Sequence, residues 1–264
     1  MRRWLKTGLG RLVFAGGLHH LALRRAAVIV TFHRVDDALV GDPISCTRQT
    51  FRAFCEFFRT YFVVVSLDEL CDKLARGADI GRHLVISFDD GYADNFEVAA
   101  AELRELGLPA SFFVATGFVG TDRTPAWDAA KGIKSRWMTW DQVRSLHGQG
   151  FTLGAHTVNH VDLGAVSRAE AVGEIVGSKQ RLEAEVGQAA RHFAYPFGGP
   201  EHLTAANRRE VVRAGFRTCL SAYGGVVRAD TDPLAMRRVA ITPWYRDPFQ
   251  FGFELIRTAM DGAR

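Results

Sequence analysis

Cysteine is scarce in this sequence, and none of it is spaced for cross-linking or for holding a metal. Four of the 264 residues are cysteines, and no two of them form a C-x-x-C pair. Disulfide frameworks belong mostly to much smaller secreted domains. We therefore predict free thiols in helix and strand interiors, which fits a cytoplasmic protein. The four are Cys46, Cys55, Cys71 and Cys219.

The usual marks of nucleotide- and nucleic-acid-binding proteins are also missing. The chain has 33 basic and 29 acidic side chains, a net charge of +4, with no run of Lys or Arg and no zinc-finger spacing. Because this charge is weak and dispersed, we expect no nucleic-acid partner. No G-x-G-x-x-G follows the first predicted strand, which argues against a dinucleotide-binding fold. No repeat or linker interrupts the chain, so we expect one large domain.

The N-terminal segment lacks a long hydrophobic run. Residues 1–23 are basic and amphipathic, without the apolar core and small-residue cleavage site of a signal peptide, and they are too short and interrupted to span a bilayer. They could form a helix packed on the domain, or a helix lying on a membrane surface. We expect an N-terminal helical extension at 1–26 and a domain at 27–264. The expected location is cytoplasmic, in the second case at the inner face of the membrane.

Short apolar segments alternate with helical patterns from residue 27 onward. Strands that are buried on both faces and separated by helices form parallel sheets. About seven such units favour an α/β fold with a distorted (β/α) barrel over an open doubly wound sheet. In such barrels the chemistry gathers at the C-terminal ends of the strands. The predicted strands are 27–32, 62–65, 84–88, 110–114, 151–155, 191–195, 218–220 and 238–241.

Ionisable residues directly follow several of these strands. His33 follows the first strand, Asp89 and Asp90 follow 84–88, and His156 and His160 follow 151–155. Alone, Asp-Asp-Gly is a common turn, and two histidines four residues apart are often unrelated surface residues. Together, two histidines and one aspartate make a common catalytic metal site with open positions. A second aspartate beside that site can accept a proton from water.

Three motifs resemble those of the NodB-type polysaccharide deacetylases, a family of carbohydrate esterases. Residues 87–91 (SFDDG) are similar to the family's [T/S]-F-D-D-G signature, and residues 156–160 (HTVNH) to its H-[S/T]-x-x-H metal motif. Residues 193–198 (FAYPFG) resemble its third motif. The order and spacing of the motifs also fit, and the resemblance covers about residues 27–242.

The resemblance implies a metal site and a base. Asp90, His156 and His160 would hold one divalent metal ion, most simply zinc, although cobalt, nickel or manganese would also suit these ligands. Asp89 would be the general base that activates a water molecule.

The resemblance also implies supporting roles around that centre. Thr157 would brace the histidine loop by hydrogen bonding. The backbone N–H of Phe197 would help to stabilise an oxyanion, with Tyr195 as a further oxyanion- or substrate-binding residue.

Two positions depart from the family's pattern. The third motif usually carries an arginine that orients the catalytic aspartate, where this chain has Ala194. Arg238, on the last predicted strand, is our candidate to replace it. The family often places its general acid in a late L-x-H motif, which is absent here. His33 ends a similar Thr-Phe-His sequence after the first strand, so we predict a circularly shifted motif order in which His33 protonates the leaving amine.

The expected reaction is hydrolysis of a non-peptide carbon–nitrogen bond, the acetamide of an N-acetylated sugar. Polysaccharide, oligosaccharide and lipid-linked glycan all fit as substrates. Two alternatives stay open: a non-catalytic carbohydrate-binding member of the fold, which Ala194 favours, and a hydrolase of another amide or ester. Tryptophans that either line a sugar platform or pack in the core are Trp127, Trp137, Trp140 and Trp244.

Overall fold

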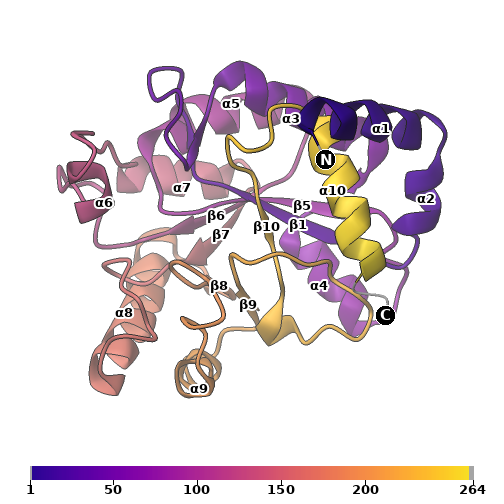
Figure 1. Ribbon diagram of the computed structural model, residues 1–264. Coiled ribbons are helices and arrows are strands. Elements are labelled where there is room, and N and C mark those ends of the chain that lie inside the picture. The colour runs from indigo at the N-terminus through magenta and orange to yellow at the C-terminus, as the bar shows by residue number, and fades with distance from the viewer. Residues whose placement is uncertain (1, 262–264) are drawn as a thin grey trace.

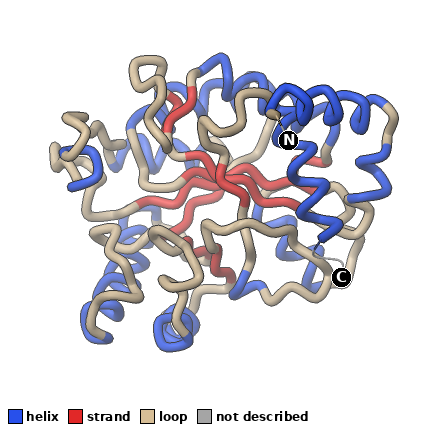
Figure 2. Tube along the Cα trace, viewed as in Figure 1, coloured by secondary structure: helices blue, strands red, loops and turns tan. Residues whose placement is uncertain are grey.

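A computed structural model describes residues 2–261 of the chain (Figure 1). Its centre is a curled sheet in which every pair of neighbouring strands is parallel, with the order β10-β1-β5-β6-β7-β8-β9 and with β4 also paired to β5. The strands lie in the middle of the molecule and helices surround them (Figure 2). They are β1 (Val28–Phe32), β4 (Val63–Val64), β5 (His83–Phe88), β6 (Ser111–Val114), β7 (Thr152–Ala155), β8 (His192–Ala194), β9 (Thr218–Leu220) and β10 (Val239–Ala240).

The two ends of this sheet are linked by the segment that precedes β10. Met236 forms a parallel bridge with Leu220 of β9, and the Ser221 N–H donates to the Met236 carbonyl at 3.0 Å. On the other side, the Ile241 N–H donates to the Thr31 carbonyl at 2.8 Å. The predicted distorted (β/α) barrel of about seven strands is therefore confirmed, with its closure resting on short pairings.

Side chains alternate between the outer and inner faces of the strands, as the two-residue period requires. On β1, Val28, Val30 and Phe32 face outward and belong to the main core with the surrounding helices, whereas Ile29 belongs to a second cluster inside the barrel. Both faces are buried, which is why the strand sequences read as continuous apolar runs. The interior is so tightly filled that a Cβ on Gly154 would lie 2.4 Å from the ring of Phe113.

The helices begin and end where local signals place them. Ser66 and Ser167 accept hydrogen bonds from the backbone N–H groups of Glu69 and Glu170, and Gly187 ends its helix in the left-handed region at φ 74°. The helices are α3 (Arg48–Tyr61), α4 (Leu67–Ala75), α5 (Ala100–Leu106), α6 (Ala126–Ala129), α7 (Trp140–Gly148), α8 (Arg168–Val186) and α9 (Ala205–Arg213). Smaller elements are β2 (Arg34–Val35), β3 (Ser45–Cys46), the π-helix η1 (Asn95–Ala99) and the 3₁₀ turn η2 (Pro233–Ala235).

The N-terminal segment forms two helices, α1 (Arg3–Ala15) and α2 (Leu18–Ala22), which pack against the C-terminal helix α10 (Pro248–Asp261). The backbones approach so closely that a Cβ on Gly10 would lie 2.1 Å from the Phe249 carbonyl oxygen. Phe14 is buried and its ring meets those of Phe57 and Tyr61. Among residues 2–261, no helix combines the length and apolar content needed to cross a bilayer.

Candidate active site

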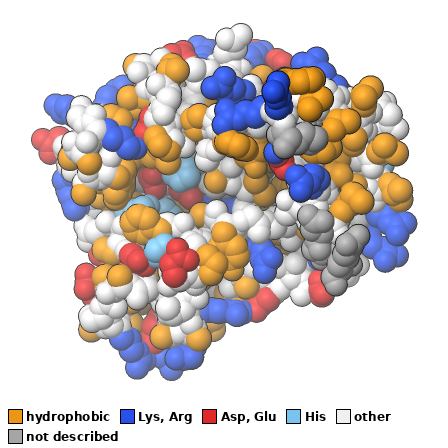
Figure 3. All heavy atoms as spheres, in the orientation of Figure 1, with side chains coloured by type: hydrophobic (Ala, Val, Ile, Leu, Met, Phe, Trp, Pro, Cys, Tyr) orange, Lys and Arg blue, Asp and Glu red, His pale blue; other side chains and the backbone are white. Residues whose placement is uncertain are grey.

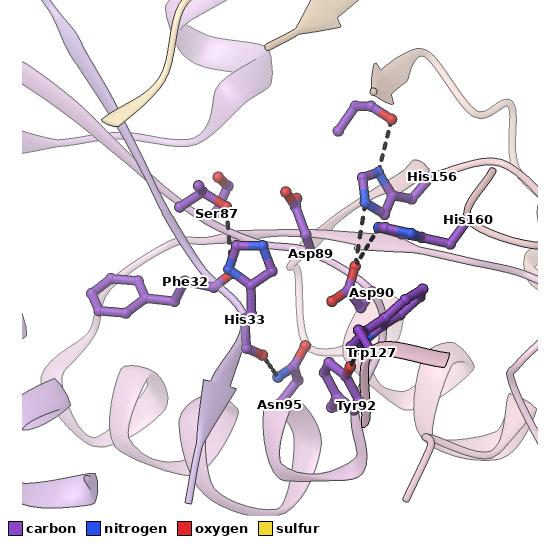
Figure 4. Close-up of polar contacts among 12 residues, drawn as sticks. Phe32, His33, Ser87, Asp89, Asp90, Tyr92, Asn95, Trp127, His156 and His160 are labelled. Atoms are coloured by element: carbon purple, nitrogen blue, oxygen red, sulfur yellow. Dashed lines mark hydrogen bonds and ion pairs between the residues drawn. The ribbon is translucent and has the colours of Figure 1, made fainter. Parts of the chain in front are cut away.

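The C-terminal ends of three parallel strands bring the ionisable residues of the sequence motifs together. His33 follows β1, Asp89 and Asp90 follow β5, and His156 follows β7, with His160 on the same loop. Figure 4 shows His33 on one side of the two aspartates and both other histidines on the opposite side. The strand-end rule thus positions residues that lie far apart in the sequence.

Asp90, His156 and His160 form a compact set of metal-binding groups. Their ligand atoms lie within 4.8 Å of one another, and the Nε2 atoms of His156 and His160 are 3.3 and 3.2 Å from Asp90 Oδ1. His156 Nδ1 lies 2.8 Å from the Ala194 carbonyl oxygen, so it carries the ring proton and leaves the Nε2 lone pair for a metal. A buried carboxylate facing two imidazole nitrogens fits a divalent cation such as zinc.

The electrostatics of Asp90 fit the same interpretation. Burial alone would raise its pKa, but the neighbouring His160 and His156 outweigh that effect and hold the pKa well below its ordinary value. The carboxylate is therefore charged at neutral pH, and a cation is the partner that a buried charge of this kind requires.

Backbone strain is concentrated around this site. Among residues 2–261, five non-glycine residues have positive φ, and four of them are Asp90, Thr157, His160 and Phe197. Such conformations cost roughly 1–3 kcal/mol each and persist only where the surrounding structure holds them. The site residues are thus fixed in place by the fold before any ligand binds.

Asp89 lies inside the barrel and is hydrogen-bonded to Arg238, the residue that precedes β10. The guanidinium donates two hydrogen bonds to the carboxylate at 2.7 and 2.8 Å. It also donates to the hydroxyls of Thr31 and Ser87 and to the Ser221 carbonyl, and Arg238 and Asp89 are both buried. Burial would raise the pKa of Asp89, but Arg238 and His156 outweigh it and the pKa lies below its ordinary value. Arg238 therefore fixes the orientation of the Asp89 carboxylate.

His33 stands across the aspartates from the metal-binding histidines. The Asn95 side-chain amide, at the start of the π-helix η1, donates to the His33 carbonyl at 2.7 Å and fixes its backbone. Burial lowers the pKa of His33 below its ordinary value, although Asp90 and Asp89 act in the opposite direction. A π-helix beside a catalytic site is a common arrangement, and no pattern in the sequence announced it.

Phe197 and Tyr195 point to opposite sides of the same strand end. Phe197 is 51% exposed with φ 60°, and its ring lies 4.9 Å from that of His160. None of the hydrogen bonds formed within residues 2–261 uses the Phe197 N–H. Tyr195 is 2% exposed and packs in the outer core against Phe193, so the structure does not bring its phenol to the site.

The histidine loop is braced by Glu174 of α8, not by the Thr157 hydroxyl. Glu174 accepts hydrogen bonds from the Val158 and Asn159 backbone N–H groups at 2.8 and 2.7 Å and from the Asn159 side chain at 2.7 Å. The Thr157 hydroxyl has no partner within the described residues, which corrects our expectation for it. The available signal was a carboxylate among the buried positions of α8, between Ala171 and Ile175.

A second brace on His160 was not predicted from the sequence. The Trp127 ring lies 4.6 Å from that of His160, and its indole N–H donates to the Tyr92 hydroxyl at 2.9 Å. Tyr92 in turn donates to Asp128 at 3.3 Å, and Asp128 is buried in an ion pair with Arg34, the residue after His33. This chain of contacts connects the two sides of the site.

Three further tryptophans and two further histidines make their ring contacts or ion pairs with residues outside the metal-binding set. Trp137 is buried and stacked on Tyr92, whereas Trp140 contacts Arg181. Trp244 is exposed and contacts Arg3. His19 stacks on Phe14, and His192 pairs with Asp68 at the start of β8.

The fold is similar to that of several solved deacetylases. The IcaB protein from Ammonifex degensii is 22% identical and superposes with a TM-score of 0.72 over 86% of this chain and 96% of its own. The Streptococcus pyogenes deacetylase PplD is 19% identical, with a TM-score of 0.72 over 89% and 99% of the two chains. A de-N-acetylase from Aggregatibacter actinomycetemcomitans gives 18% identity and a TM-score of 0.73, over 86% and 99%. At these identities the likeness concerns the fold.

Sequence comparison identifies the family. YxkH of Bacillus subtilis (strain 168), whose description contains the words polysaccharide deacetylase, is 24% identical over 162 residues, or 61% of this chain. The match covers 52% of that relative, about half of its length. The model of the polysaccharide deacetylase family matches residues 76–218, which include Asp89, Asp90, His156 and His160 but neither His33 nor Arg238. This match extends over more than half of the chain, which therefore belongs to the polysaccharide deacetylase family.

Proposed function

We propose that this chain is a metal-dependent hydrolase that removes the acetyl group from an N-acetylated sugar. One observation carries the proposal: a buried, ionised Asp89 held by Arg238 stands next to the convergent groups of Asp90, His156 and His160. A protein that only binds sugars has no use for a base fixed in this way.

The residues around Asp90 are suited to one divalent ion, and zinc is our first choice. Two imidazoles and one carboxylate leave open positions in a tetrahedral site, although cobalt, nickel and manganese accept the same donors. When bound, such an ion would polarise the acetamide carbonyl and lower the pKa of water.

Asp89 is the proton acceptor in this proposal. Arg238 occupies one hydrogen-bonding position on each carboxylate oxygen, and each oxygen keeps a further lone pair. The depressed pKa keeps Asp89 charged at neutral pH and thus able to accept a proton from water.

Phe197 and His33 are the two remaining residues with a role in the proposed reaction. The free N–H of Phe197 would donate to the developing oxyanion, and its left-handed backbone, held by the following Gly198, fixes where that N–H points. His33 lies on the other side of the aspartates and would donate a proton to the departing amine, so that an amino sugar and acetate leave. This role requires the circularly shifted motif order.

Arg238 weakens the case for a non-catalytic member of the fold. That alternative depended on Ala194, because the usual orienting arginine is absent there. The Arg238 guanidinium, supplied by the residue that precedes β10, removes this argument. A hydrolase of another amide or ester is distinguished by substrate. We further propose a cytoplasmic location at the inner face of the membrane, supported by the surface of α1 described below.

The decisive experiment compares metal content and acetate release. The chain is purified without a polyhistidine tag, its bound metal is measured, and acetate is assayed with N-acetylglucosamine oligomers. We expect metal in the wild type and in Asp89→Asn, loss of metal in His156→Ala, and acetate from the wild type alone. Failure to bind metal after reconstitution would refute the proposal, and release only from non-sugar amides or esters would favour the other hydrolase.

A further inference from the structure

The helix α1 presents an apolar face to solvent. In most surface helices the apolar stripe faces the core, and α1 does bury Gly10 and Phe14 against the domain. Yet Trp4 and Leu12 are 65% and 71% exposed, and Leu5 and Leu9 are exposed beside them. At helical spacing these positions share one side, and the other exposed residues on that side are Gly8 and Ala15, which carry no charge.

The exposed apolar surface continues onto the neighbouring helices. Leu18 and Leu21 of α2 and Met260 of α10 are each at least 60% exposed. They line a groove between α2 and α10 with an apolar floor that includes Phe253 and Ile256. We name the exposed side chains of the three helices the apolar patch: Trp4, Leu5, Leu9, Leu12, Leu18, Leu21 and Met260.

The charged side chains that the N-terminal segment itself contributes beside the patch are all basic. The first 35 residues contain seven Lys or Arg and no Asp or Glu. Lys6 and Arg11 pair with Glu254 and Asp247 of α10 and its leading segment. Arg24 and Arg25 are exposed beside the groove, and neither takes part in an ion pair within the described residues.

We propose that the apolar patch is a docking surface for an anionic lipid bilayer, with α1 lying in the plane of the interface. An exposed apolar stripe next to uncompensated arginines is complementary to acyl chains and phosphate headgroups together. A second copy of this chain is a poorer occupant, because a twofold contact would bring the same arginines together.

Docking through the apolar patch would bring the active site close to the membrane surface. The Arg3 guanidinium lies 4.0 Å from the ring centre of Trp244, on the loop that follows β10 at the catalytic end of the barrel. Figure 3 shows a hollow that contains histidine and acidic side chains, and exposed apolar side chains elsewhere in the same view. The contact of Arg3 with Trp244 places the N-terminal end of the patch near the catalytic end of the barrel, which would keep the site near glycans carried by the bilayer.

Vesicle flotation of the full chain tests this inference without any substrate, so its outcome is independent of the proposed reaction. The probes are vesicles of phosphatidylcholine alone and vesicles that also contain phosphatidylglycerol. We expect the wild type to float with the anionic vesicles and to be released by salt. Leu12→Glu should lower binding by about tenfold or more, because a charge replaces an exposed apolar group that would enter the bilayer.

Matched variants separate the patch from general effects of charge. Val212→Glu, an exposed apolar position on α9, should bind like the wild type. Arg24→Ser with Arg25→Ser should lower anionic binding by about thirtyfold, at roughly fivefold for each arginine. Arg209→Ser with Arg217→Ser, two exposed arginines on and beyond α9, should leave it unchanged.

Three results would overturn the inference. The wild type could stay with the soluble fraction for both vesicle types, or Leu12→Glu could float as well as the wild type. The third is a stable dimer in sedimentation that Leu12→Glu dissociates, which would assign the patch to a second copy. Circular dichroism of each variant confirms that the fold is retained.

Discussion

Arg238 Nη1 and Nη2 donate to the two carboxylate oxygens of Asp89 at 2.8 and 2.7 Å, although 149 residues separate the partners in sequence. The pair lies inside the barrel, and the remaining donors of the guanidinium reach Thr31, Ser87 and Ser221. An arginine beside the final strand thus orients the Asp89 carboxylate in a chain whose third motif has alanine at position 194.

Replacing Arg238 should disable the base without removing the metal site. In Arg238→Met the buried Asp89 carboxylate loses its partner, so burial raises its pKa and the ionised base is populated only at higher pH. We expect kcat to fall by about 10²-fold or more and the acidic limb of the pH profile to move to higher pH. Stability should fall by roughly 3–5 kcal/mol, the cost of leaving a buried charge unpaired.

Arg238→Lys is the informative companion to that variant. Lysine keeps the positive charge but not the two-pronged geometry, so we expect the pH profile to stay near that of the wild type while kcat remains low. Metal content, measured on both proteins, should be unchanged. Wild-type turnover in Arg238→Met would show that Asp89 needs no orienting arginine.

Much of the site could be predicted because its signals are local. Apolar runs marked the strands, and residues directly after a strand must lie at one end of a parallel barrel, which brought Asp89, His33 and His156 together. The side of the barrel that Tyr195 faces was also readable. Side chains along a strand alternate between its two faces, so residue 195 must face away from the barrel interior if Ala194 faces into it. The structure has Ala194 in the interior cluster and Tyr195 in the outer core.

The braces were not predictable, because they depend on contacts between distant segments. Glu174 lies on the apolar face of α8, but nothing in the sequence shows that this face meets the histidine loop. The contact of Trp127 with His160, and the ion pair of Asp128 with Arg34, join a loop to strands far away in the sequence. Hydrophobic periodicity carries no information on such pairings.

His33 should act late in the reaction, and its pH dependence has a definite sign. Its pKa lies below the ordinary 6.5 because of burial, and a nearby divalent cation would lower it further. A general acid works in its protonated form, so kcat/KM at saturating metal should fall as pH rises through that lowered pKa. His33→Gln should lose about 10²–10⁴-fold in turnover, retain metal, and show no such fall.

Steady-state kinetics over a range of pH, with metal content determined at each point, provide the measurement for His33. His147→Gln, a histidine on α7 away from the strand ends, is the control and should behave as the wild type. Near-normal turnover of His33→Gln would assign the acid to another group and with it end the shifted motif order.

Glu174 should set the metal affinity through the loop that it holds. Its carboxylate satisfies two backbone N–H groups and the Asn159 side chain, and an alanine would leave all three donors without partners. We expect Glu174→Ala to weaken metal binding by about 10–100-fold, the usual effect of losing a group that orients a ligand. Competition with a chelator of known affinity gives the Kd.

The control for that variant is Glu170→Ala, which removes an exposed carboxylate from the first turn of the same helix. Its metal affinity should match that of the wild type. Equal affinities for Glu174→Ala and the wild type would mean that the strained backbone of Thr157 and His160 holds the loop without help from α8.

Asp94 should make the protein less stable at neutral pH than at acidic pH. Burial raises its pKa from 3.8 to about 6, even though the Val35 N–H and the Asn95 amide donate to it. The folded chain therefore holds this proton more tightly than the unfolded chain. The stabilisation that this bound proton contributes is fully present below pH 3.8, the ordinary pKa of aspartate, and it is lost as the pH rises through about 6. Asp94→Asn, which is neutral throughout and keeps an acceptor for Val35, should gain about 3 kcal/mol at most above that range and nothing below it.

Urea unfolding followed by tryptophan fluorescence, on either side of about pH 6, measures this difference. Asp122→Asn, at an exposed loop position, is the control and should follow the wild type at every pH. A loss of stability in Asp94→Asn at high pH would have a clear meaning. The Asp94 charge would then interact favourably enough with Arg34 to exceed its desolvation cost, and the pKa in the folded state would lie below 3.8 and not above it.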